Sequence, residues 1–114
     1  MKIDIQTQNF SLTPAIKKHI NQHCGTMIHH FSNHIINVHI HLSDINGSKR
    51  GKDKRCLVHI ELHRLPTIII ENTEHDLYNA INKASHRAQR AVRKALERKQ
   101  TRERHSYTPA VHSY

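Results

Sequence analysis

A stretch of the chain from Glu74 to Arg102 contains neither glycine nor proline. At about 100° per residue on a helix, its apolar side chains fall within roughly 60° of Leu77, which makes one narrow stripe. The stripe consists of Leu77, Ile81, Ala84, Ala88, Val92 and Ala95. Because such a stripe has to be buried against another element, the pattern predicts a long helix that packs along one side.

The same helix carries a second face that is basic. Five cationic side chains fall together at roughly 220° to 300° from Leu77. We call these residues the basic ridge: Lys83, Arg87, Arg90, Lys94 and Arg98. Glu97 and Glu103 are the only acidic residues after Asp76, so pairs within the helix cannot neutralise the ridge. A row of this kind suits a phosphate backbone, because arginine binds phosphate through two donors and each contact releases counterions.

The whole chain is basic as well. It has 114 residues, with 18 Lys and Arg against 9 Asp and Glu, which gives a formal net charge of +9. An excess of this size attracts a polyanion, and nucleic acid is the first hypothesis. No apolar run is long enough to cross a membrane and the N-terminus does not resemble a signal peptide, so we expect a cytoplasmic protein with no membrane or small-molecule partner.

The rest of the chain reads as alternating strands with one further helix. Residues 2–8 alternate with the period of a half-buried strand. Thr13 followed by Pro14 predicts the start of a helix that ends near His30. Three more strands are expected over residues 36–42, 58–63 and 67–71, with Asn72 or Thr73 as the cap of the long helix.

This order, β-α-β-β-β-α, predicts one α+β domain over residues 1–102. Because consecutive strands favour antiparallel neighbours, we expect a four-stranded, mainly antiparallel sheet with both helices on one face, a two-layer sandwich. Residues 103–114, which include Pro109, are expected to form a flexible tail. The connection over residues 44–55 is expected to be a solvated loop that offers an auxiliary contact through Lys49, Arg50, Lys52, Lys54 and Arg55.

The thirteen histidines raise a competing hypothesis of metal binding. His39 and His41 alternate on one strand and His59 and His63 on another, so paired strands would place four imidazoles beside Glu61. We do not assign a metal site, because spacing by two follows from strand geometry and no cysteine ligand joins the group. Cys24 and Cys56 are expected to be buried, and no phosphate loop or paired carboxylates suggest an enzyme or a cofactor.

Two segments carry a resemblance to a known family. Residues 76–83, DLYNAINK, followed by regularly spaced basic residues, resemble the second-helix signature of the ribosome hibernation-promoting factors, also called ribosome-associated inhibitor A or sigma-54 modulation proteins. Residues 5–16, with Asn9, Leu12-Thr13 and Ala15-Ile16, are similar to that family's first strand and helix. The resemblance covers roughly residues 1 to 100, and this chain has Asn82 where the family often has aspartate.

The resemblance implies a short-form, non-catalytic factor that binds ribosomal RNA of the small ribosomal subunit under stress or in stationary phase. Such a factor occupies the channel of messenger and transfer RNA and silences translation, and its topology resembles double-stranded-RNA-binding domains. Carried over by position, the family's basic residues match Arg87, Arg90 and Lys94, with Lys83 and Arg98 extending the ridge and Lys17 on the first helix. A histidine-rich metal-binding protein and a general RNA-binding protein remain the alternatives.

Overall fold

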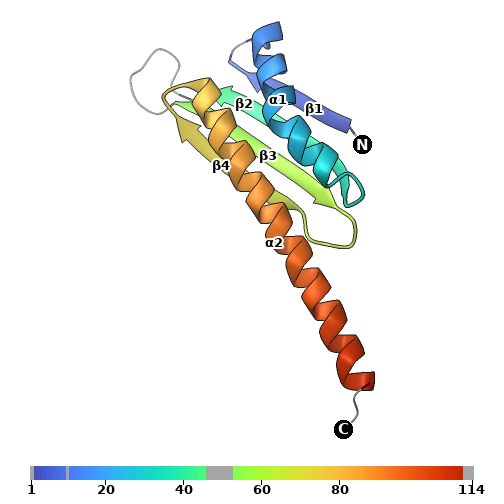
Figure 1. Cartoon of the computed structure of the whole chain (residues 1–114). Helices are drawn as coiled ribbons and strands as arrows, with labels where there is room; N and C mark the ends of the chain where they lie inside the picture. The colour runs from blue at the N-terminus through green and yellow to red at the C-terminus, as the bar shows by residue number, and fades with distance from the viewer. Residues whose placement is uncertain (1, 10, 46–52, 112–114) are drawn as a thin grey trace.

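A computed structural model of the chain describes residues 2–9, 11–45 and 53–111. These residues form four strands and two helices in the predicted order β-α-β-β-β-α. The elements are β1 (Lys2–Gln8), α1 (Pro14–His30), β2 (Ile35–Asp44), β3 (Lys54–Leu62), β4 (Ile68–Glu74) and α2 (Leu77–Val111). Both helices lie on one face of the sheet, which confirms the predicted two-layer α+β architecture (Figure 1).

The strands lie in the sheet in their sequence order, β1-β2-β3-β4. β1 runs parallel to β2, because α1 connects them and returns the chain to the same end of the sheet. β2, β3 and β4 are joined by direct connections and pair antiparallel. β1 and β4 are therefore the two edges, and α2 lies over the half of the sheet that contains β3 and β4 (Figure 1).

Alternating side chains of the strands form the core under the two helices. Val38, Ile40 and Leu42 of β2 are buried, as the alternation predicts. Alternation through the strand expected over residues 36–42 would place Ile36 on the same face, but Ile36 is 40% exposed, whereas Ile35 is buried. The pairing of β2 with β3 shifts register between Ile35 and Asn37, and this bulge turns Ile36 outward.

The start of the first helix was predicted correctly, and that of the second was not. The first is confirmed, because the Thr13 hydroxyl accepts a hydrogen bond from the Ile16 amide at 3.2 Å and Pro14 opens α1. The second helix begins later than expected, after Asp76, whose carboxylate accepts the Asn79 amide at 3.1 Å. Glu74, expected in this helix, is the last residue of β4.

Beyond the sheet α2 continues as an isolated projection (Figure 1). It extends to Val111 rather than ending near Arg102, so its length is about 52 Å. Leu96 is the last α2 residue with a buried side chain among those whose side chains the structure describes. Neither helix, over the described residues, has a long enough apolar stretch to span a bilayer.

Both cysteines are buried, as expected. Cys24 of α1 lies with its sulfur 3.1 Å from the Ser85 hydroxyl of α2, which links the two helices. Burial raises the pKa of the Cys24 thiol, and the Ser85 hydrogen bond opposes part of that rise. Burial, followed by the proximity of Cys24, raises the pKa of Cys56 to about 12.

These thiols are therefore expected to be protonated and unreactive in the folded protein. The thiolate is the nucleophile, and a rise in pKa from about 9 to about 12 lowers its population at pH 8 about a thousandfold. Cys56 should react with a thiol reagent at pH 8 at least about a thousandfold more slowly in buffer than in denaturant. Equal rates in the two conditions would contradict this packing of β3 under α2.

Candidate nucleic-acid interface

The burial of the α2 stripe determines where the basic ridge points. Ile81, Ala84, Ala88 and Val92 are fully buried against the sheet. All five ridge residues are exposed, as the helical spacing predicts. Because α1 packs against the opposite side of α2, the ridge faces the open edge of the sheet at β4.

Two ridge residues are held by β4. The Arg87 guanidinium donates from Nη1 to the Glu71 carbonyl oxygen at 2.7 Å and to Asn72 Oδ1 at 3.3 Å. Lys83 Nζ lies 3.2 Å from Glu74 Oε1, in an ion pair that the sequence did not predict because its acid comes from the strand. Arg87 thus has a fixed orientation with other donors left over, and part of the Lys83 charge is neutralised.

The other three ridge residues lie further along the helix. Within the described part of the chain, Arg90, Lys94 and Arg98 form no ion pair and no side-chain hydrogen bond. Long cationic side chains without partners keep their charge and donors for a ligand. The ridge is therefore strongest as an anion-binding surface between Arg87 and Arg98.

Two hollows run beside these residues, between α2 and the edge of the sheet. The first, about 400 Å³, is lined by Ile70, Ala91, Arg93 and the ridge from Arg87 to Lys94. The second, about 800 Å³, is lined by the turn between β3 and β4, by Ile68 and by α2 as far as Thr101. Both include Lys94 and Glu97, so we treat them as one feature, the trough.

The auxiliary contact expected on the connection between β2 and β3 is only partly within the described residues. Lys49, Arg50 and Lys52 lie outside them. Lys54 and Arg55 belong to β3 and not to a loop.

Both β3 residues have acidic partners. Lys54 Nζ lies 3.0 Å from Asp44 Oδ2 and 3.2 Å from Asp53 Oδ1, and these hydrogen bonds raise the pKa of Lys54. Arg55 Nη2 lies 2.9 Å from Glu71 Oε2 on the face of the sheet away from the helices. Neither side chain joins the ridge.

Lys17 is also separated from the ridge. It is exposed on α1 and lines a shallow depression with Pro14, Lys18, Asn21 and Gln22. His19 occupies the side of α1 that faces α2, where its Nε2 lies 2.6 Å from Asn82 Oδ1. The structure therefore does not bring Lys17 together with the five residues on α2.

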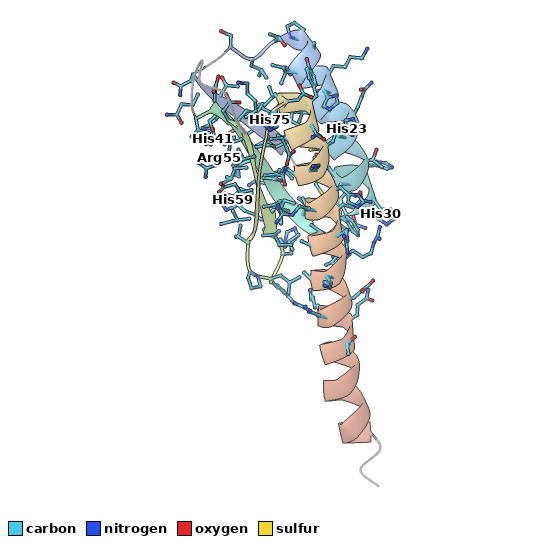
Figure 2. All side chains as sticks on the ribbon, turned by 90° about the vertical axis from the view of Figure 1, so that its left-hand side faces the viewer. His23, His30, His41, Arg55, His59 and His75 are labelled. Carbon is cyan, nitrogen blue, oxygen red and sulfur yellow. The ribbon has the colours of Figure 1, made fainter. Side chains whose placement is uncertain are left out.

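The face of the sheet away from the helices carries the strand histidines. Figure 2 shows His41, Arg55 and His59 pointing away from the helices. His39 pairs with His59 across β2 and β3, and its two ring nitrogens each lie 3.6 Å from a carboxylate, that of Asp4 or that of Glu61. His63, expected on the same strand face, follows the end of β3.

These histidine and carboxylate side chains do not form a metal site within the described residues. No cluster of three or more His, Cys, Asp or Glu side chains in that part of the chain is arranged to hold an ion. The arrangement favours ordinary contacts between imidazoles and carboxylates on a solvated sheet.

Sequence reasoning missed two contributors to the interface. Arg93 is exposed and lines the first hollow, although its helical angle of roughly 160° sets it beside the ridge. A wider angular window would have included it. The β4 acceptors of Arg87 and Lys83 carried no local signal, because they lie in another element whose pairing with the helix depends on tertiary packing.

Comparisons with known proteins place this arrangement in a family. Residues 3–100 match the family described as sigma 54 modulation protein / S30EA ribosomal protein. The fold is similar to the N-terminal domain of Protein Y from Thermus thermophilus, with TM-score 0.69, 22% identity and coverage of 82% of this chain and 98% of that one. It is also similar to a ribosomal subunit interface protein from Coxiella burnetii, with TM-score 0.65, 18% identity and coverage of 82% and 96%. The comparison with curated protein sequences gives no match.

Because Lys83 is paired with Glu74, one substitution should increase the positive charge that the ridge offers to an anion. Glu74→Gln removes the paired charge and should increase retention on heparin, with a rise of up to about one in the log-log salt slope as Lys83 gains a contact. Glu71→Gln makes the same charge change at a carboxylate that pairs with Arg55 on the other face of the sheet. Equal retention of the two variants would contradict the assignment of the ridge as the main anion-binding surface.

Proposed function

The chain belongs to the family of sigma 54 modulation and S30EA ribosomal proteins, and from this premise we propose that it binds the ribosome through the basic ridge of α2. The observation that supports this most is a row of exposed cations along the β4 side of α2. Three of them, Arg90, Lys94 and Arg98, have no partner within the described part of the chain. Ribosomal RNA supplies the matching row of phosphates.

The proposed binding mode follows from how the ridge is held. Arg87 is pre-oriented by the Glu71 carbonyl, so it loses less side-chain entropy when it binds a phosphate. Arg90, Lys94 and Arg98 then extend the contact along about two turns of helix. The contact is with the backbone, so it gives affinity and orientation but little sequence specificity by itself.

The finer proposal concerns where and when the protein binds. We propose that it occupies the messenger and transfer RNA channel of the small ribosomal subunit under stress or in stationary phase, and that this silences translation. One similar solved structure is named a ribosomal subunit interface protein, which supports a site between the subunits. The protein acts in the cytoplasm as a binding factor and catalyses no reaction.

Two alternative functions make different predictions for the same binding experiments. A general RNA-binding protein would bind large subunits and plain duplex RNA as tightly as small subunits. A histidine-rich metal-binding protein would keep stoichiometric metal after dialysis against a chelator and would not need the ridge. The general RNA-binding alternative uses the same cations of α2, so preference for small subunits is what separates it from the proposal. Among the described residues the histidines of the sheet lie on another face and form no group of three or more ligands, which does not favour metal binding.

Co-sedimentation with purified ribosomal subunits tests the proposal. The wild-type protein should pellet with small subunits in preference to large ones. Arg90→Ala/Lys94→Ala should weaken this binding by about a hundredfold or more, because each of the two lost charge-assisted contacts is worth roughly 1.5 to 3 kcal/mol. Alanine preserves the helix, so the fold should remain intact.

The matched control is Lys18→Ala/Lys99→Ala, which removes the same charge from α1 and from the other side of α2. Its binding should stay within about twofold of wild type, because neither lysine belongs to the ridge: Lys18 is on α1, and Lys99 lies at roughly 40° from Leu77. Equal losses in the two double variants would show that net charge alone drives the binding. Equal pelleting with both subunits would favour general RNA binding.

A further inference from the structure

The trough beside the ridge contains an apolar surface, which a phosphate backbone would not contact. Its floor is apolar, made by Ile70 and Ala91 in the first hollow and by Leu65, Pro66, Ile68 and Ala95 in the second. Its rim is cationic along α2. A regular duplex presents phosphates and sugars, so it would rest on the rim and leave the floor in water.

An unpaired nucleotide matches both parts of the trough. Its base has a flat apolar face that packs on aliphatic side chains or on a guanidinium plane, and its phosphates are anionic. The two hollows, about 400 and 800 Å³, fall in the range of roughly 300 to 1,000 Å³ that is typical of sites for small organic groups. A base can therefore enter while its neighbouring phosphates stay on the ridge.

Glu97 distinguishes a base from other anionic ligands. Its exposed side chain lines both hollows among the cations, and within the described part of the chain its carboxylate has no partner. A carboxylate there accepts hydrogen bonds from the amino group of a base and repels a second carboxylate. An acidic peptide would thus meet a like charge at the point that the two hollows share.

The edge of β4 also disfavours a peptide that adds as a strand. Added strands bind through the free backbone groups of an edge. Arg87 already donates to the Glu71 carbonyl on β4, next to the first hollow. A new strand would have to break this 2.7 Å hydrogen bond to pair there.

We propose that the trough takes an unpaired nucleotide of RNA, so that the protein prefers RNA with a bulged or looped base beside a run of phosphates. This inference rests on the proposed function, because it assumes that the ridge binds RNA. The inference adds specificity to the proposed function, because the ridge alone would bind any accessible phosphate backbone, whereas the trough requires an unpaired base. Ala91 and Glu97 become the residues that distinguish one RNA from another.

Fluorescence anisotropy with two RNA hairpins tests the inference. The hairpins have the same stem and a closing loop too tight to expose a base, and one carries a single bulged adenine. The wild-type protein should bind the bulged hairpin about tenfold more tightly, the scale of one stacked base. Ala91→Leu fills the first hollow without changing the charge of the ridge, and it should reduce this preference to less than about threefold.

The matched control is His86→Leu, an apolar replacement at an exposed position of α2 outside the trough. It should keep the full preference for the bulge. The wild-type comparison needs no variant, so the inference remains testable if Ala91→Leu does not fold.

Each other outcome has a defined meaning. Equal affinity for the two hairpins would overturn the inference and leave the proposed function intact. No binding of either hairpin would also overturn the inference, whereas the proposed function fails only if the protein does not pellet with small subunits. An acidic peptide with alternating Glu and Leu is the competitor that tests the other occupant. Displacement of the bulged hairpin by this peptide at equal concentration would overturn the inference in favour of a protein ligand.

Discussion

The burial of the α2 stripe against β3 and β4 is the contact on which the remaining geometry depends. Over about three turns, Ile81, Ala84, Ala88 and Val92 are fully buried in the core. A helix buried on one side has no freedom to rotate, so its remaining faces point in fixed directions. This packing aims Arg87, Arg90, Lys94 and Arg98 at the open edge of the sheet and creates the trough between helix and strand.

The two faces of the molecule differ in charge as a result. The β4 side of α2 carries the ridge, whereas the uncovered face of the sheet carries Asp4, Glu61 and Glu71 with histidines between them. A polyanion approaching the protein is therefore steered toward α2 and not toward the sheet.

The sequence predicted those parts of the fold that depend on local periodicity. Alternation identified the strands, and the spacing from Leu77 gave both the buried stripe and the ridge. The Thr13 cap was found because its signal lies in adjacent residues. The family resemblance is confirmed by the match over residues 3–100, and it indicated function where the charge pattern alone indicated only a polyanion.

The errors arose where tertiary contacts decide. Glu74 was assigned to the long helix because it opens the stretch without glycine or proline, but it is the last residue of β4 and pairs with Lys83. Lys54 was expected to be free in a loop, although strand pairing places it between two aspartates. Ile36 is exposed because a bulge shifts the register of β2 against β3 between Ile35 and Asn37. None of these partners can be read from neighbouring residues in the sequence.

The central claim is that the ridge, and not net charge, binds RNA, and the salt dependence of affinity tests it most directly. With contacts from Arg87, Arg90, Lys94 and Arg98, the slope of log affinity against log salt should be about −2.8 to −3.6. Lys94→Ala should reduce its magnitude by about 0.7 to 0.9, and Lys99→Ala, on the same helix, should leave it unchanged. A flat response of the wild type, or equal changes in the two variants, would contradict the account.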